Sequence, residues 1–242
     1  MENPLVVGVD GSESSLLAVD WAADEAARHG LPLRLVHAFL WERYERARPA
    51  FRTDRPAGEV MAQNIVASCA ERARLRDPQV KVSADVVAAD AVPTLLRAGS
   101  EAFALVTGVR GRGEVTGLLL GSVSLTVAAR AMCPVVVVRG EERVLRGSVG
   151  RVVVGVGDAT GVSAALDDAL REAVREHPEV DVSRRTVEGP AHRVLLEASA
   201  DADLIVVGAQ RRHGHFGLQL GSVAHALLHH SACPVAVVPH PV

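Results

Sequence analysis

The chemistry of this sequence is concentrated in a glycine-rich stretch between residues 107 and 123. Its glycines let the backbone approach a ligand without an intervening Cβ, and they stand at Gly108, Gly111, Gly113 and Gly117. Gly121 and Ser122 follow at the expected start of a helix, where N–H groups and the helix dipole favour an anion. Arg110 and Arg112 add positive charge. The stretch therefore predicts a phosphate site, whose candidate residues are Gly108, Arg110, Gly111, Arg112, Gly113, Gly121 and Ser122.

The spacing of these glycines separates the stretch from the commoner nucleotide loops. No Gly-Lys-Ser/Thr closes it, which excludes a Walker A loop, and the glycines do not form a compact GxGxxG turn. A glycine-rich surface loop without a ligand is the alternative. The apolar run before the stretch and the helix expected after it favour phosphate binding.

A second polar group, Asp10-Gly11-Ser12, follows the apolar run Leu5–Val9. That run is β-branched and unalternating, as in a central parallel strand buried on both faces. Open α/β sheets bind ligands at the carboxyl ends of their strands. Asp10 is therefore a candidate to bind a ribose hydroxyl, or phosphates through Mg²⁺, which carboxylates coordinate. The alternative is a turn residue that accepts hydrogen bonds from nearby backbone.

Strand and helix patterns alternate along the first 139 residues. Further strands are expected at 33–39, 80–87, 103–107 and 134–138, and helices from the Ser12–Ser14 region to about His29, at 59–76, at 92–101 and from Ser122. Ser12 or Ser14 can cap the first helix, and Gly30 can end it. The alternation predicts an α/β fold with a doubly wound parallel sheet, in which Asp10 and the glycine-rich stretch share one edge. The long connection Leu40–Gly58 either folds over a bound base or is a surface excursion, and the sequence favours neither.

The chain contains a second, shorter copy of this pattern. Val6–Val9 recurs as Val153–Val156, 147 residues later, whereas Gly108 recurs as Gly208, 100 residues later. The second copy has therefore lost 47 residues, the difference between 147 and 100, between its first strand and its glycine-rich stretch. Two domains are predicted, at 1–139 and 151–242, joined by a polar linker.

The deletion decides which elements the second copy can form. Strands are expected at 151–156, 180–187 and 204–207, and helices at 162–176 and 192–200. We interpret 180–187 as the counterpart of the third strand. The second strand and the second helix are then the missing elements.

The second copy has also lost candidate site residues. Gly157 stands in place of Asp10, although Asp158 stands beside it. Arg211 stands in place of Gly111 and His213 in place of Gly113. A long side chain in place of Gly111 would crowd a phosphate, which predicts a degenerate domain that binds nucleotide weakly or not at all. The alternative is a bare phosphate held by Arg211, Arg212, His213 and His215.

The order Gly108, two residues, Gly111, nine residues, Gly121-Ser122 resembles the ATP-binding signature of the universal stress protein family. The resemblance covers nearly all of residues 1–139 and implies a Rossmann-like domain of the adenine-nucleotide alpha hydrolase type, with strand order 3-2-1-4-5. It implies that Asp10, with Gly11 and Ser12 beside it, lies near adenine, ribose or metal. It further implies an adenine contact from the backbone of Ala38, and ribose and phosphate contacts from Gly108, Gly111, Gly121, Ser122 and Val123. The two copies together resemble a tandem-domain protein of actinobacterial type.

Two valine-rich strands, Val135–Val138 and Val235–Val238, would each lie at a sheet edge too apolar to leave uncovered. In the universal stress protein family such edges pair antiparallel between domains, which implies intramolecular pairing of the two copies here. The alternative is that each strand packs only beneath its own helices. A monomer and a homodimer of such modules both stay open.

Composition limits the classes of function. A net charge of −3 gives no case for nucleic acid, no apolar run is long enough to cross a bilayer, and the N-terminus lacks a signal-peptide core, so cytoplasm is expected. Three cysteines without a CxxC pair give no disulfide framework, and Cys69 is expected to be a helix-core thiol. His225 and His229 have the spacing of zinc ligands but no third ligand, so solvated or capping histidines are the preferred interpretation.

These observations predict a tandem universal stress protein that binds ATP in its first domain only, with Mg²⁺ as a candidate ion at Asp10. The expected role is nucleotide-dependent regulation of an unknown partner. Two alternatives stay open, a ligand-free interaction scaffold and a slow ATP hydrolase or nucleotidyl-transfer enzyme. No catalytic residue is assigned, because no general base and arginine finger have a sequence argument for lying together.

Overall fold

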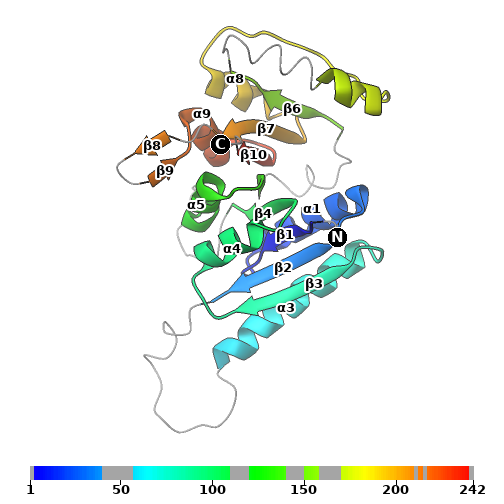
Figure 1. The fold of residues 1–242 in the computed structure, drawn as a ribbon, viewed down its shortest axis with the longest axis vertical. Helices are drawn as coiled ribbons and strands as arrows, with labels where there is room; N and C mark the ends of the chain where they lie inside the picture. The colour runs from blue at the N-terminus through cyan, green and yellow to red at the C-terminus, as the bar shows by residue number, and fades with distance from the viewer. Residues whose placement is uncertain are drawn as a thin grey trace.

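The computed structural model of the chain describes residues 3–39, 57–109, 120–139, 150–157, 170–209, 212–214 and 217–239. Within them one eight-stranded sheet runs through both copies, in the order β3-β2-β1-β4-β5-β10-β7-β6 (Figure 1). The first copy supplies five strands and four helices: β1 Leu5–Gly8, α1 Glu13–His29, β2 Leu33–Ala38, α3 Ala57–Arg76, β3 Val82–Val87, α4 Ala91–Gly99, β4 Ala104–Gly108, α5 Ser122–Arg130 and β5 Val135–Val138.

The second copy is smaller. Residues 170–176 are helical. The other elements are β6 Val152–Gly155, α8 Ala191–Ala198, β7 Leu204–Ala209, β8 Arg212–Gly214, β9 Gly217–Gln219, α9 Ser222–His230 and β10 Val235–Pro239. In the described part of the chain, no helix has the length and apolar character needed to cross a bilayer.

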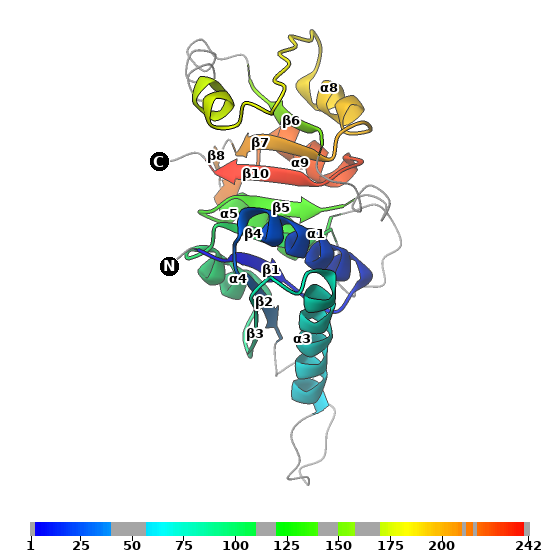
Figure 2. The same cartoon turned by 90° about the vertical axis from the view of Figure 1, so that its right-hand side faces the viewer.

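The first five strands are parallel and follow the order 3-2-1-4-5, as the family resemblance implies. The two valine-rich strands then join the copies, because β10 pairs antiparallel with β5 and Val237 lies opposite Val135. Figure 2 shows the arrows of β5 and β10 side by side and pointing in opposite directions. The predicted intramolecular pairing is present, and it removes two apolar sheet edges at once.

Each face of the sheet carries its own core. Helices α1 and α3 cover one face of the first copy, where Val7 and Val106 are fully buried. Helices α4, α5 and α9 cover the other face and enclose Leu105 and Ile205. The second of these cores continues without interruption across the β5–β10 junction, so the two copies are packed as well as hydrogen-bonded together.

Local signals begin and end the first helix as predicted. Ser12 rather than Ser14 is the N-cap of α1, and its Oγ accepts a hydrogen bond from the N–H of Ser15 at 3.3 Å. Gly30 ends the helix in the left-handed conformation, with φ of 66°, which glycine adopts without steric cost. Helix α3 begins at Ala57, two residues before the predicted start.

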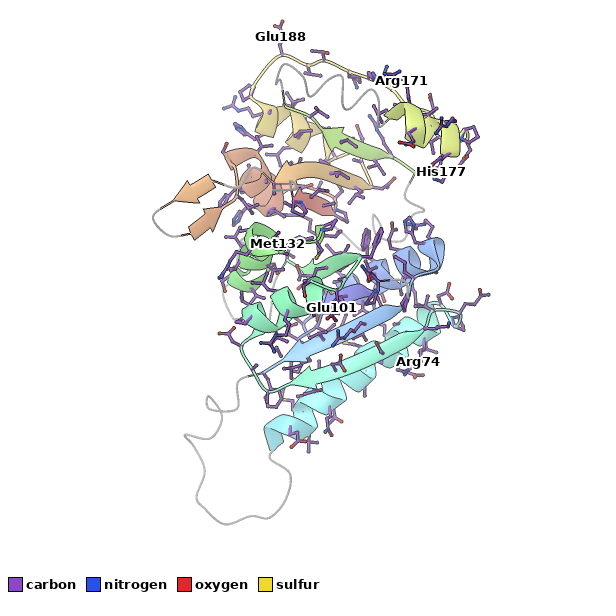
Figure 3. The ribbon with its side chains drawn as sticks, viewed as in Figure 1. Arg74, Glu101, Met132, Arg171, His177 and Glu188 are labelled. Carbon is purple, nitrogen blue, oxygen red and sulfur yellow. The ribbon has the colours of Figure 1, made fainter. Side chains whose placement is uncertain are left out.

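The predicted strand at 180–187 is wrong. These residues are exposed and form no strand, and Figure 3 shows Glu188, next to the segment, pointing away from the molecule. The reason is the order of the sheet. In the first copy β3 pairs with β2, and the described residues of the second copy contain no counterpart of β2, so among them 180–187 has no neighbouring strand to pair with. The second copy therefore contributes only β6, β7 and β10 to the described sheet, with β6 at its edge.

The glycine-rich stretch of the second copy holds a short hairpin that the sequence analysis did not predict. Strand β8 pairs antiparallel with β9, with Arg212 opposite Gln219 and Gly214 opposite Gly217. Several predicted features lie outside the described residues: 40–56, Arg110, Gly111, Arg112, Gly113, the linker at 140–149, Asp158, Arg211 and His215.

Candidate functional site

Three parallel strands end at one edge of the first copy. Strand β1 lies between β2 and β4, with Gly8 opposite Val36 and Val7 opposite Val106. Continuing these registers past the strand ends brings Asp10 level with Ala38 on one side and with Val109 on the other. The edge is a topological switch point, since the chain leaves β1 for a helix on one face and β4 for a helix on the other.

Asp10 forms the turn that starts α1. Its Oδ1 accepts hydrogen bonds from the N–H of Ser12 at 3.0 Å and from the Oγ of Ser12 at 2.6 Å. Gly11, between them, has a φ of 76°, a conformation that favours glycine. The turn role that the sequence left open for Asp10 is therefore present. The turn also fixes the position of the carboxylate at the end of β1.

Gly108 brings the first turn of α1 against the end of β4. A Cβ on this residue would lie 2.4 Å from the carbonyl oxygen of Ser14, so only glycine fits. The carbonyl oxygen of Gly108 also accepts a hydrogen bond from the Oγ of Ser124 at 2.7 Å. Gly108 thus joins α1 and α5, the two helices whose N-termini face this edge.

The N-terminus of α5 is built differently from that of α1. Its N-cap is Gly121, which makes no side-chain cap, and the N–H of Gly121 donates to the carbonyl of Val109 at 2.7 Å. The first-turn N–H groups, at Ser122 and Val123 among others, therefore have no capping side chain. Such an uncapped N-terminus binds anions. The nearby Oγ1 of Thr107 is buried and has no hydrogen-bond partner among the described residues.

His37 belongs to this edge and was missed in the sequence. Its Nδ1 donates to the carbonyl oxygen of Val9 at 2.6 Å, and its side chain is buried. The bond joins the last residues of β2 to the residue before Asp10. The ring of Phe39 lies parallel to the imidazole at 6.2 Å between centroids. The available signal was a polar residue near the end of the strand Leu33–Ala38, directly before Ala38.

A small pocket lies beside Ala38, at the ends of β2 and β3 and the start of α3. Its volume is about 220 Å³, and it is lined by Phe39, Glu59, Gln63, Val86 and Ala88. Small-molecule pockets usually occupy about 300–1,000 Å³. The pocket is therefore too small to hold a whole nucleotide.

Cys69 is a helix-core thiol, as predicted. It is fully buried, and burial raises its pKa to about 11. The charge of Asp10 adds to this shift, whereas Arg72 opposes it. A thiol with such a pKa is protonated at neutral pH and is not a nucleophile.

Eight of the predicted site residues are described and lie around this edge: Asp10, Gly11, Ser12, Ala38, Gly108, Gly121, Ser122 and Val123. Among described residues, no cluster of three or more His, Cys, Asp or Glu side chains could hold a metal ion. Mg²⁺ at Asp10 would thus take its other ligands from phosphate and water, as this ion commonly does.

The described residues of the second copy form no comparable edge. Gly157 replaces Asp10 and is exposed. No described strand pairs with the outer edge of β6, so nothing corresponds to Ala38. Helix α9 keeps an N-terminus without a side-chain cap at Gly221.

His229 corrects the interpretation of the C-terminal histidines. It is not solvated or capping, because its Nδ1 accepts a hydrogen bond from the backbone N–H of Leu120 in the first copy at 3.4 Å. Its neighbours His225 and His230 are exposed.

Comparison with known proteins agrees with this architecture. The chain is 31% identical to universal stress protein Rv2005c of Mycobacterium tuberculosis H37Rv over 289 aligned positions, which cover 98% of this chain and 97% of the relative.

The fold has also been solved in other universal stress proteins. The crystal structure of one from Archaeoglobus fulgidus DSM 4304 covers all of both chains with a TM-score of 0.73 and 18% identity. Another from Archaeoglobus fulgidus, in complex with dAMP, covers 57% of this chain with a TM-score of 0.43 and 21% identity, and no conclusion about a ligand here follows from it. Matches to the universal stress protein family span residues 1–139 and 140–239, so the chain belongs to this family and contains its domain twice.

Proposed function

We propose that this protein binds ATP at the ligand edge of its first domain and acts as a nucleotide-dependent regulator. One observation carries the proposal: the turn at Asp10, the strand end at Ala38 and the uncapped N-terminus of α5 meet at a single switch point. Adenine nucleotides bind at such points in open α/β sheets.

Each part of the edge suits a different part of the nucleotide. The N–H groups of Ser122 and Val123 are suited to phosphate oxygens, because the helix dipole and the unpaired donors both favour an anion. The carboxylate of Asp10 suits a ribose hydroxyl or a Mg²⁺ ion that bridges to phosphate. The backbone of Ala38, between His37 and Phe39, suits the edge of the adenine ring.

The second domain is proposed to bind no nucleotide. It lacks a carboxylate at Gly157 and a strand beside β6 in the described residues. An uncapped helix N-terminus alone at Gly221 offers only a weak anion site.

Regulation rather than turnover is the proposed role. In the described part of the edge, His37 uses its Nδ1 to hold the carbonyl of Val9, and the Oδ1 of Asp10 already accepts two hydrogen bonds from Ser12. Neither is arranged as a general base for an attacking water. Any hydrolysis of ATP is expected to be slow.

The test uses a matched pair of variants, Ser122→Asp and Ser222→Asp. Both residues are the first residue of their helix and are exposed, and Asp in a first turn interacts favourably with the helix dipole, so both proteins should fold. Titration calorimetry with Mg·ATP should give one site per chain for the wild type. Ser122→Asp should weaken binding by about ten-fold or more because the new carboxylate repels phosphate, and Ser222→Asp should not change it.

Other outcomes decide against parts of the proposal. Two sites per chain would refute the degeneracy of the second domain. No binding at millimolar ATP would favour the ligand-free scaffold. Loss of affinity in Ser222→Asp alone would show that the nucleotide binds in the second domain and would refute the proposed site.

A further inference from the structure

One hydrogen bond connects the second domain directly to the proposed phosphate site of the first. The backbone N–H of Leu120 donates to the Nδ1 of His229, near the end of α9, at 3.4 Å. Leu120 is buried and immediately precedes Gly121, the N-cap of α5. The turn that presents the N–H groups of Ser122 and Val123 is thus held on one side by the carbonyl of Val109 and on the other by His229.

The contact has no counterpart on the other side of the pseudo-symmetric junction. At the repeat offset of 100 residues, His229 corresponds to Ala129 and Leu120 to Leu220. The side chain of Ala129 has no hydrogen-bond acceptor, so it cannot hold the turn at Gly221 as His229 holds the turn at Gly121. The interaction runs in one direction only, from the truncated domain to the domain with the nucleotide edge.

A second one-sided contact fixes the end of α9. Arg139, just after β5, is buried and donates from Nη1 to the carbonyl oxygen of Leu228. Its counterpart at the same offset is Pro239, which has no donor. Arg139 therefore holds the last turn of α9 against the first domain, and His229 is the next residue along that turn.

The hydrogen bond requires a neutral imidazole. An Nδ1 that accepts from a backbone N–H carries no proton, so the single ring proton lies on Nε2, which is buried without a hydrogen-bond partner in the described residues. Among these residues the charges that act on the ring come from His225 and His230 on its own helix and from Arg139. Burial lowers the pKa of His229 below its ordinary value of 6.5, and its interactions with these three neighbours lower it further. His229 is therefore neutral at neutral pH and loses its acceptor in acid.

We propose that His229 is a positioning residue for the nucleotide site, through which the second domain holds the Leu120-Gly121 turn and releases it when the imidazole is protonated. This inference rests on the proposed function, since the turn matters for binding only if a phosphate occupies the N-terminus of α5. It also gives the truncated domain a role that does not require a ligand of its own.

The test compares His229→Ala, which removes the acceptor, with His229→Asn, whose Oδ1 can take the place of Nδ1 but does not titrate. His225→Ala is the control, because His225 lies on the same helix and touches the His229 ring, 4.5 Å between centroids, without bonding to Leu120. The first readout is amide hydrogen exchange of Leu120 without nucleotide. It should be roughly five-fold faster in His229→Ala, the factor for one ordinary hydrogen bond, and unchanged in His225→Ala and His229→Asn.

The second readout is affinity for Mg·ATP by calorimetry, in a series of buffers from pH 7.5 downwards. At pH 7.5 His229→Ala should bind about five-fold more weakly than the wild type, and His229→Asn should match the wild type. As the pH falls through the lowered pKa of His229, the affinity of the wild type should fall below that of His229→Asn by a similar factor. Comparing the two proteins at each pH cancels the effect that protonation of ATP itself has on the affinity.

The outcomes separate this inference from the proposed function. If neither the wild type nor any variant binds ATP, the proposed function fails. The amide exchange rate of Leu120 then still decides whether His229 holds the turn. Unchanged exchange in His229→Ala overturns the inference, and so does faster exchange with unchanged affinity. If His229→Ala does not fold, identical acid profiles of the wild type and His229→Asn overturn it, because another group would then be responsible.

Discussion

Strands β1 and β6 have nearly the same sequence and opposite surroundings. In β1 and the residue after it, Leu5, Val7 and Val9 are 1%, 0% and 4% exposed. Their counterparts at an offset of 147, Val152, Val154 and Val156, are 48%, 53% and 44% exposed. Both strands are apolar enough to be central. Only β1 has a strand on each side, and only β1 lies beneath both α1 and α3.

The difference shows what the deletion removed. The repeat offsets predict that the second copy lacks the second strand and helix. Such a loss would uncover one side of β6 and would also remove the strand end that matches Ala38. The other end of the second copy's sheet keeps its pairing, since β10 lies between β7 and β5.

The largest expected effect contrasts two glycines. Gly108→Ala should lower the free energy of unfolding by about 3 kcal/mol or more, because its Cβ would meet the carbonyl of Ser14. Gly208→Ala should change stability by less than about 0.5 kcal/mol, since no described atom lies within 4 Å of its Cβ. Urea unfolding of both variants measures this. Equal effects would mean that the two strand ends are equally crowded.

The next contrast tests the two first strands directly. Val7→Ala should lower the free energy of unfolding by about 2–3 kcal/mol, because Val7 is fully buried and the change leaves a cavity. Val154→Ala, at the matching exposed position, should cost less than about 1 kcal/mol. Urea unfolding of both variants measures this difference. A large loss in Val154→Ala would show that β6 is covered in solution.

Helix α3 packs on α1 in the first copy. The described residues of the second copy contain no counterpart of α3. Asp20, on α1, accepts two hydrogen bonds from Arg72, both at 2.6 Å, and its side chain is 10% exposed. Asp20→Ala should cost about 1–2 kcal/mol. Asp24→Ala is the control, because its ion pair with Arg76 is exposed and should contribute less than about 0.5 kcal/mol. Thermal unfolding would contradict this account if the two variants were equally stable.

The smallest contrast is between two positions that the copies share. Cys133 and Cys233, 100 residues apart, are both buried, and burial raises the pKa of each thiol. Both should stay protonated at pH 8 and resist iodoacetamide in the folded protein, as should Cys69. Mass spectrometry after alkylation would report any difference. Faster labelling of Cys233 than of Cys133 would show that the truncated domain opens more readily.

Much of the first domain could be predicted because its signals are local. The cap at Ser12, the left-handed Gly30 and the apolar runs of the strands each act within a few residues, and all appear as expected. The repeat added a long-range constraint, and the pairing of β5 with β10 followed from it. For the same reason, the sequence could predict that eight candidate residues lie at one edge of the sheet. They follow strands whose order the family pattern implies.

What the sequence by itself determined is therefore the set of strands, their parallel order in the first copy and the residues at their ends. The tertiary structure alone decided the rest. Residues 180–187 have the composition of a strand, but a strand needs a neighbour to accept its backbone hydrogen bonds, and the neighbour is deleted. His229 meets Leu120 across 109 residues of chain, and no local pattern signals such a contact. It exists because the β5–β10 junction brings α9 of one domain against the turn before α5 in the other.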